Sequence, residues 1–248
     1  MNRPSKRNAL NTELLDDLDA AFDAAENDPL VKAVVLSGAG PSFCAGYDID
    51  SGYYTTAPDG GWTVGNSLER LTAIERRYRR IWDFPKPTVA QVHGHALAAG
   101  CYLQMLCDIS VAASDAVFGH PAVKLGGATS MPLWQILMGS KAARYLLMTG
   151  RLIDGRRAEQ VGLVSLSVPH EALADTVDAI AAECAAVPTG GQRLNKAVLN
   201  TELEIMGLGA LFRYRAQANA LARVERGSDP PDWGKLGLND RVPGARSE

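Results

Sequence analysis

The chain has 248 residues, a formal charge of −3 and a hydrophobic content of 46%, which together predict one large globular domain or a core with a smaller helical part. The weak net charge excludes the basic footprint of a nucleic-acid-binding protein, and no run approaches the roughly 18 apolar residues of a membrane span. No signal peptide opens the chain and no Cys-x-x-Cys pair occurs, so we expect reduced thiols in a cytoplasmic protein with neither nucleic-acid nor membrane partners.

Helical and strand patterns alternate in the first half of the chain. Asn11 can cap a helix that reaches about Ala25, because apolar side chains recur along this segment at helical spacing. Residues 49–66 lack periodicity and predict a loop. The other elements expected here are, in chain order, a buried strand over 31–37, a helix over 67–82, a strand over 88–93 and a helix over 99–106.

The second half of the chain changes from alternating elements to helices alone. The expected elements are strands over 108–113 and 117–118, two helices within 131–149 broken at Gly139, a helix over 154–161, a strand over 164–168, and helices from 170 to about 227. This order predicts an α/β core over residues 1–190 and a helical C-terminal region over residues 191–248.

Two turns of small residues, Phe43–Asp48 and Gly94–Cys101, each follow a short apolar run. Small side chains let backbone N–H groups approach a ligand closely. If the turns meet in the fold, two N–H groups can converge on one oxygen and stabilise an enolate or a tetrahedral anion, as in an oxyanion hole. The alternatives are two ordinary tight turns, or a catalytic cysteine at Cys44 or Cys101, beside which no orienting histidine is evident.

Two further patterns give only weak signals. Gly38–Gly40 is followed by Pro-Ser-Phe rather than by x-x-Gly, which makes it a poor dinucleotide fingerprint. His93 and His95 alternate at the end of an expected strand, so their side chains would point to one side. No third ligand is visible in the sequence, and we expect no metal site.

A series of motifs in order along nearly the whole chain resembles the enoyl-CoA hydratase/isomerase family, within the crotonase superfamily. The segments that carry the resemblance are Asn2–Asn11, Phe43–Asp48, Lys86–Leu103, Cys107–Ile109, Phe118–Pro121, Leu125–Gly126, Thr149–Arg151 and Ala158–Val164. The resemblance implies an α/β crotonase spiral of repeated ββα units, with C-terminal helices that form a homotrimer or a dimer of trimers. It also implies acyl-CoA thioester substrates and no cofactor apart from the coenzyme A of the substrate.

The resemblance also implies roles for residues of the two turns. The oxyanion donors would be the N–H groups of Ala45 and Ala99, the latter at a helix N-terminus where the dipole favours negative charge. The substrate and its CoA moiety would contact residues of the N-terminal stretch, the two turns and a later loop. These are Lys6, Arg7, Gly46, Tyr47, Asp48, Gly100 and Ser130, with a solvated basic surface and a turn-capping aspartate as the alternatives for Lys6–Arg7 and Asp48.

The chain departs from the family where the chemistry is expected. Tyr102 and Ala122 stand at the positions of the two glutamates of the hydratases, and the turn after Gly126, where isomerases place an acid, has none. Tyr102 and His120 are therefore the candidate acid and base. Trp62, Tyr53 and Tyr54 are candidates for lining the acyl pocket.

The resulting prediction is a CoA-thioester enzyme of the hydratase/isomerase type, acting through an enolate held in the oxyanion hole. The alternatives are a non-catalytic acyl-CoA-binding protein, a divergent thioester hydrolase, decarboxylase or C–C hydrolase, and a purely structural oligomerisation partner. Ordinary hydration has no evident general base without the two glutamates.

Overall fold

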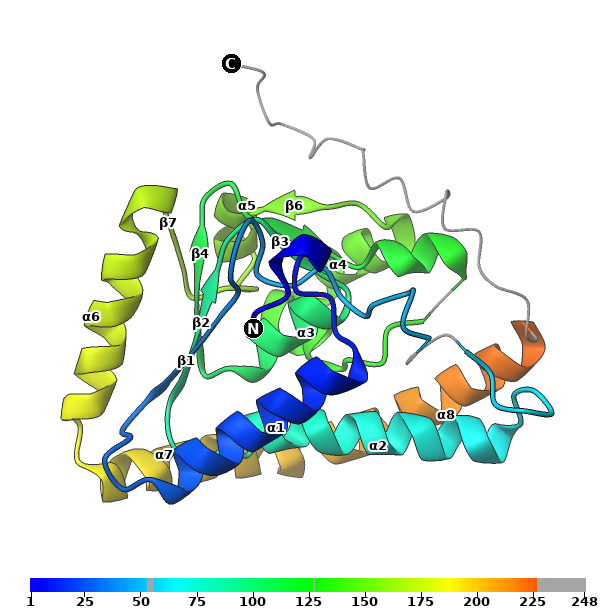
Figure 1. The fold of residues 1–248 in the computed structure, drawn as a ribbon, viewed down its shortest axis with the longest axis horizontal. Helices are drawn as coiled ribbons and strands as arrows, with labels where there is room; N and C mark the ends of the chain where they lie inside the picture. The colour runs from blue at the N-terminus through cyan, green and yellow to red at the C-terminus, as the bar shows by residue number, and fades with distance from the viewer. Residues whose placement is uncertain (53–55, 127, 227–248) are drawn as a thin grey trace, which may run out of the picture.

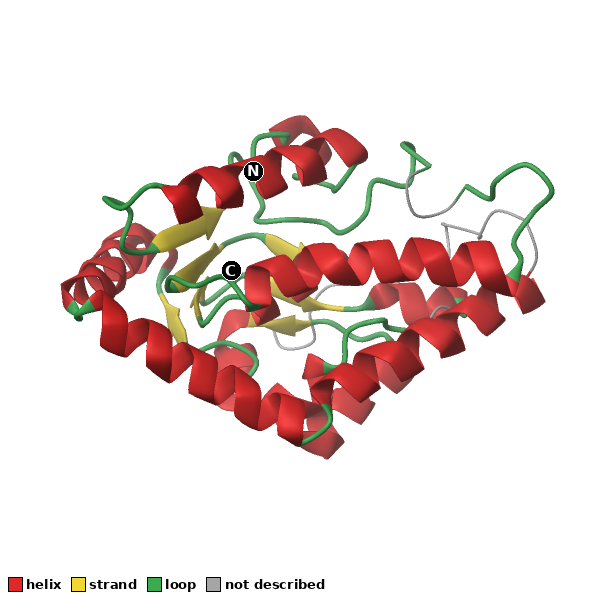
Figure 2. Cartoon of the chain, turned by 90° about the horizontal axis from the view of Figure 1, so that it is seen from below, coloured by secondary structure: helices red, strands yellow, loops and turns green. Residues whose placement is uncertain are grey.

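The structure is a computed structural model that describes residues 1–52, 56–126 and 128–226. Tyr53, Tyr54 and the Gly- and Pro-rich tail after Pro230 lie outside these described residues. Two small sheets occupy the centre, and helices surround them (Figures 1 and 2). None of the helices in the described part combines the length and apolar character needed to cross a membrane.

The larger sheet is parallel and has the strand order β1-β2-β4-β7, formed by β1 (Val34–Ser37), β2 (Thr88–Val92), β4 (Ile109–Ala113) and β7 (Leu166–Val168). The smaller sheet has the order β3-β5-β6, formed by β3 (His95–Leu97), β5 (Val117–Gly119) and β6 (Ile153–Asp154). Strand β3 pairs in parallel with β5, and β5 pairs antiparallel with β6. Of each consecutive pair β2–β3 and β4–β5, the first strand thus lies in the larger sheet and the second in the smaller one, as in a spiral of repeated ββα units.

A sharp corner between β2 and β3 makes this arrangement possible. Gly94 stands at the corner with φ of +55°, and a Cβ atom there would lie 2.0 Å from the Pro41 carbonyl oxygen. Only glycine fits so close to another backbone in a left-handed conformation. The corner separates β3 from β2 and aims it at the helix α3 (Ala99–Leu106).

The expectation of a buried strand over residues 31–37 is wrong in length and in burial. Strand β1 begins only at Val34, whose N–H donates to the Pro87 carbonyl oxygen, and Val35 is 37% exposed. The physical reason is that β1 lies at the edge of the sheet and pairs with β2 alone. Strands β3 and β6 were not expected at all, because three and two residues are too few to show an alternating pattern.

The helical expectations for the first half are confirmed. Helix α1 (Thr12–Asn27) has Asn11 as its N-cap, whose side chain accepts a hydrogen bond from the Leu14 N–H. Helix α2 (Val64–Trp82) begins three residues earlier than expected, because Thr63 and Asn66 form a capping box.

The second half also follows the expected order. Helix α4 (Leu133–Thr149) is broken by non-helical backbone at Gly139, as expected. It is followed by α5 (Gly155–Gln160), α6 (Leu173–Ala186), α7 (Thr189–Ile205) and α8 (Leu208–Arg226). The boundary expected near residue 190 falls at the start of α7, whose N-cap is Pro188, and the division into two domains stays a prediction.

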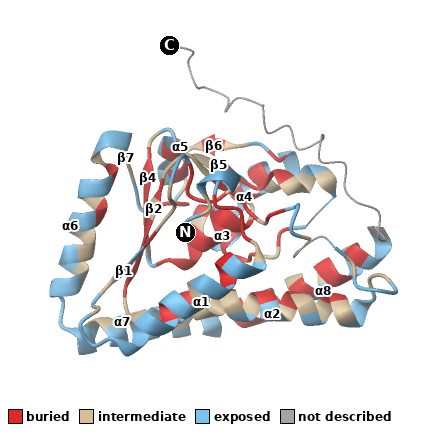
Figure 3. Cartoon of the chain, in the orientation of Figure 1, coloured by how far each residue is buried: buried red, intermediate tan, exposed pale blue. Residues whose placement is uncertain are grey.

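The core is centred on α3 and the inner strands, which are mostly buried in Figure 3. Every residue of α3 is buried. Helix α8 packs along α2, and α2 in turn contacts α3.

Candidate active site

The two turns of small residues meet in the structure. The Cys44 N–H donates to the His95 carbonyl oxygen at 2.8 Å, and the Leu97 N–H donates to the Cys44 carbonyl oxygen at 3.0 Å. A Cβ atom on Gly100 would lie 2.0 Å from that same Cys44 oxygen. The first turn and the start of α3 are therefore in backbone contact, and glycine is required at residue 100 for this approach.

The start of α3 presents an N–H group beside the first turn. Ala98 precedes the helix with φ of 48° and ψ of −116°, and Ala99 is its first residue. Among the described residues, no acceptor takes a hydrogen bond from the Ala99 N–H, as is usual for the first turn of a helix. A Cβ atom on Gly46 would lie 3.6 Å from the Ala99 nitrogen, so the first turn passes directly alongside this donor.

The prediction that the Ala45 N–H is the oxyanion donor of the first turn is wrong. The Ala45 N–H donates to the Arg7 carbonyl oxygen at 3.0 Å, so the fold itself uses it. Leu10 and Tyr47 form a parallel β-bridge. The Leu10 N–H donates to the Gly46 carbonyl oxygen, and the Asp48 N–H donates to the Leu10 carbonyl oxygen. In such a parallel bridge the N–H of the central residue, Tyr47, points away from Leu10.

Tyr102 and His120 lie together, although eighteen residues separate them in the sequence. The Tyr102 hydroxyl lies 3.4 Å from each His120 ring nitrogen and 2.8 Å from Thr129 Oγ1. Trp134 Nε1 donates to Thr129 Oγ1 at 3.0 Å. The two candidate side chains are 2% and 6% exposed, so the cluster is shielded from bulk water.

Burial sets the protonation state of His120. It lowers the pKa of the imidazole to about 4, and the positive charge of Arg215 acts in the same direction. The ring is therefore neutral at pH 7, which lets it accept a proton but leaves no imidazolium to donate one. The Tyr102 hydroxyl beside it is the proton donor available in the cluster.

The same architecture is found in known proteins, and residues 1–220 match a family model described as enoyl-CoA hydratase/isomerase. This chain belongs to the enoyl-CoA hydratase/isomerase family. A protein of Thermus thermophilus named putative enoyl-CoA hydratase is 37% identical over 225 residues, which cover 90% of this chain and 87% of that protein. The short-chain-enoyl-CoA hydratase of Clostridium acetobutylicum is 34% identical and covers 82% of this chain and 77% of its own length.

Solved structures confirm the expected crotonase fold. A probable enoyl-CoA hydratase from Mycobacterium thermoresistibile superposes with a TM-score of 0.83 at 30% identity and covers 91% of each chain. An enoyl-CoA hydratase/isomerase from Xanthobacter autotrophicus Py2 also gives a TM-score of 0.83, at 31% identity, over 93% of this chain and 83% of its own.

This member of the enoyl-CoA hydratase/isomerase family has no glutamate at the two positions where the resemblance implies one. Tyr102 lies on α3, and Ala122 lies in the short 3-10 helix Pro121–Leu125. Within the described residues, His120 and Thr129 make no hydrogen bond to a carboxylate. The cluster is thus built from hydroxyl and ring nitrogen groups rather than from acids.

The N-terminal stretch of this family member supports the first turn. Lys6 Nζ pairs with Asp50 at 2.8 Å on the exposed surface. Arg7 contributes its carbonyl oxygen to the turn, and its side chain is exposed. Arg3 forms an ion pair with the buried Asp48 at 2.8 Å. Burial alone would raise the pKa of Asp48, but the hydrogen bond from Arg3 and the nearby positive charges hold it below its ordinary value.

The remaining sequence candidates lie at different distances from the chemistry. The hydroxyl groups of Tyr47 and Tyr78 are hydrogen-bonded to each other, and the Tyr78 ring packs edge-on against Tyr102. Ser130 lines a small cavity together with Tyr78. Trp62 stacks against Arg223, near the C-terminal end of α8, with 4.7 Å between the guanidinium carbon and the ring centre.

Cysteine and metal chemistry find no support in the described residues. Burial raises the pKa of Cys44 and of Cys101 to about 12, so both are neutral thiols. His93 and His95 are hydrogen-bonded to Gly40 and Ser42. No group of three metal-ligating side chains occurs in the part of the chain that the structure describes.

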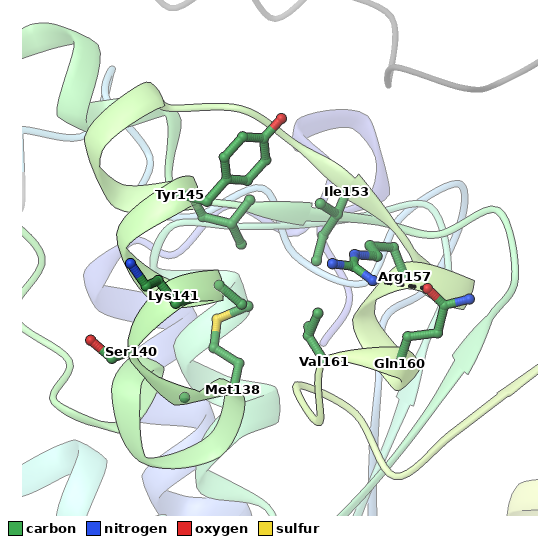
Figure 4. A pocket seen from close by; sticks show the side chains of 11 residues that line it. Met138, Ser140, Lys141, Tyr145, Ile153, Arg157, Gln160 and Val161 are labelled. Carbon is green, nitrogen blue, oxygen red and sulfur yellow. Dashed lines mark hydrogen bonds between the residues drawn. The ribbon is translucent and has the colours of Figure 1, made fainter.

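A cavity of about 660 Å³ lies away from this site, between α4 and α5 (Figure 4). Its lining includes Met138, Lys141, Tyr145 and Arg157. No residue of the two turns or of the Tyr102 cluster contributes to it, so this cavity is separate from the candidate active site.

Sequence reasoning missed three residues of the cluster or gave them no firm role: Thr129, Trp134 and Arg215. The Thr129 hydroxyl links Tyr102 to Trp134, and Arg215 Nη1 donates to the Thr129 carbonyl oxygen at 3.0 Å. Arg215 lies on α8, eighty-six residues further along the chain. No local pattern in the sequence indicates a contact over that separation.

Proposed function

We propose that this family member binds acyl-CoA thioesters and stabilises an enolate at the thioester oxygen through the N–H groups of Tyr47 and Ala99. The observation that carries the proposal is the approach of Gly46 to the Ala99 nitrogen, where a Cβ would lie only 3.6 Å away. In this proposal both N–H groups donate to the same thioester oxygen, and the α3 dipole adds partial positive charge there. Tyr47 replaces Ala45 as donor for the reason given above.

Proton transfer to and from the enolate falls to Tyr102 and His120 in this proposal. Tyr102 is three residues after Ala99, which is about one turn along α3, so the two residues lie on the same side of the helix. The Tyr102 phenol donates its proton to the α-carbon of the enolate and becomes a phenolate. When the enolate is formed rather than protonated, neutral His120, 3.4 Å from the Tyr102 hydroxyl, accepts the proton that leaves the α-carbon.

The Tyr102–His120 pair differs chemically from a pair of glutamates, and this difference limits which reactions it can support. Hydration needs a base that activates water and an acid that protonates carbon, and the two glutamates implied for it are absent. A single phenol–imidazole pair suits reactions that generate or protonate an enolate: double-bond isomerisation, decarboxylation and C–C cleavage. Thioester hydrolysis remains a further alternative for the same oxyanion hole.

The first test is a mass-spectrometric screen of the purified protein against crotonyl-CoA, a longer 2-enoyl-CoA, 3-enoyl-CoA and malonyl-CoA. Tyr102→Phe and His120→Gln should each lose turnover while the protein stays folded. The matched controls are Tyr145→Phe and His170→Gln, since both side chains are exposed and remote from the cluster. Gain of one water on crotonyl-CoA at an ordinary rate, unchanged in Tyr102→Phe, would refute the assignment of Tyr102 and His120.

A non-catalytic acyl-CoA-binding protein is the second candidate, favoured by the burial of Tyr102 and His120. A binder should gain thermal stability from acyl-CoA in proportion to the logarithm of its concentration, without converting it. Binding without any mass change across the screen would establish this second function. Neither binding nor conversion would refute both.

We also propose that the chain assembles as a homotrimer or a dimer of trimers. Helix α7 buries none of its residues, and at its end Ile205 and Met206 are 81% and 78% exposed. Large exposed apolar side chains are typical of an interaction surface. Light scattering should give a multiple of three chains, and Ile205→Glu should lower that mass, whereas a monomeric wild-type protein would contradict the proposal.

A further inference from the structure

Arg215 brings a positive charge into the Tyr102 cluster from the C-terminal helix α8. Its guanidinium donates to the Thr129 carbonyl oxygen at 3.0 Å, and the Thr129 hydroxyl in turn contacts Tyr102 and Trp134. The side chain is partly buried. The charge therefore adjoins the Tyr102 cluster and is partly removed from water.

This charge differs from those of other partly buried arginines. Arg3, Arg77, Arg79 and Arg80 have side chains that are 26–28% exposed, and each pairs with at least one carboxylate. Within the part of the chain that the structure describes, no carboxylate oxygen lies within 4.0 Å of Arg215. A cation removed from water without a counter-ion is unfavourable, so an anion from elsewhere would stabilise it.

Among the residues that the structure describes, the neighbours of Arg215 in the Tyr102 cluster do not supply that anion. His120 is neutral at pH 7, Thr129 and Trp134 carry no charge, and Tyr102 is a phenol. Burial lowers the pKa of Arg215 and the proximity of Tyr102 opposes this, which is consistent with a cation short of negative partners. A negatively charged ligand bound at this end of the site would supply the missing charge.

We propose that Arg215 binds a carboxylate on the acyl group, so that the substrates are CoA thioesters of dicarboxylic acids. The thioester oxygen would lie at the Ala99 N–H, the α-carbon beside Tyr102, and the distal carboxylate at Arg215. A planar guanidinium matches a carboxylate with two parallel hydrogen bonds. This inference rests on the proposed acyl-CoA binding and names the class of acyl group.

Calorimetric titrations of the full chain test the proposal with paired ligands that differ in the distal carboxylate. Glutaryl-CoA is compared with valeryl-CoA, and succinyl-CoA with butyryl-CoA. Wild-type protein should bind the dicarboxylic member of each pair about tenfold more tightly, as a charge-assisted hydrogen bond predicts. Arg215→Met should abolish the preference while retaining the affinity for valeryl-CoA, and Arg215→Lys should keep part of it.

The matched control is Arg213→Met, because Arg213 is an exposed residue of the same helix. It should retain the full preference. Equal affinities for both members of each pair in the wild-type protein would overturn the inference, whether or not the variants fold. A preference that survives in Arg215→Met, or a change in assembly mass with selectivity intact, would also overturn it and assign Arg215 to a contact between copies. Binding of neither class would instead refute the proposed function.

Discussion

Asn8 fastens the N-terminal stretch to the loop that leads into the first oxyanion turn, and its removal is the sharpest test of how the site is held. The side chain is fully buried. Its Nδ2 donates to the carbonyl oxygens of Ala39 and Ser42 at 2.9 and 2.7 Å, and its Oδ1 accepts from the Arg3 N–H at 2.8 Å. Its φ of 54° is left-handed, which asparagine tolerates better than alanine.

These contacts allow the cost of Asn8→Ala to be worked out. Three hydrogen bonds at about 1 kcal/mol each, and about 1 kcal/mol for alanine in the left-handed region, predict a loss of about 4 kcal/mol in the free energy of unfolding. Asn8→Gly removes the same hydrogen bonds without the backbone strain and should cost about 3 kcal/mol.

Urea unfolding at fixed protein concentration, followed by circular dichroism, measures both losses. The affinity for acyl-CoA should fall as well, because the loop before Phe43 loses its attachment. A loss below about 1 kcal/mol for Asn8→Ala would refute the reasoning, since it would mean that the three hydrogen bonds of the Asn8 side chain contribute nothing net. Equal losses for the two variants would refute the argument from the left-handed backbone alone.

Three further predictions concern the site itself. Gly100→Ala should abolish acyl-CoA binding, measured by calorimetry, because its Cβ would lie 2.0 Å from the Cys44 oxygen; unchanged affinity would contradict the close approach of the turns. The His120 pKa is about 4 in the folded state and about 6.5 in the unfolded state, so the unfolded state binds the extra proton as pH falls from 7 to 4, and the wild-type protein should lose about 3 kcal/mol of stability. Urea unfolding of His120→Gln should show a smaller loss over the same pH range, and equal losses in the two proteins would contradict the assignment. Tyr102→Phe should cost only about 1 kcal/mol in urea unfolding, since Thr129 keeps its bond from Trp134, and a loss above about 3 kcal/mol would give Tyr102 a mainly structural role.

Much of the fold follows from patterns within the sequence. Helix α1 and the break in α4 were expected because capping residues, helical periodicity and glycine act over a few neighbouring positions. The short strands β3 and β6 escaped notice because their conformation comes from pairing with β5, not from their own residues. The N-terminal end of β1 was placed too early for the same reason, since a β-branched run does not reveal where a pairing partner begins.

The candidate site divides in a similar way. The two turns and the pair Tyr102–His120 were anticipated from motif order, and the structure brings each pair together. The choice of Ala45 as donor was wrong, because the direction of an N–H depends on which strand lies beside it, here the residues around Arg7 and Leu10.

The family, the order of the elements and the absence of the two glutamates follow from the sequence alone, because residue identity and spacing are properties of the chain. Three features are visible only in the tertiary structure: the Ala45 N–H is hydrogen-bonded to Arg7, burial keeps His120 neutral, and Arg215 on α8 donates to the Thr129 carbonyl oxygen. Hydrogen-bond direction, desolvation and uncompensated charge all depend on neighbours distant in sequence, and only the folded chain brings those neighbours into contact.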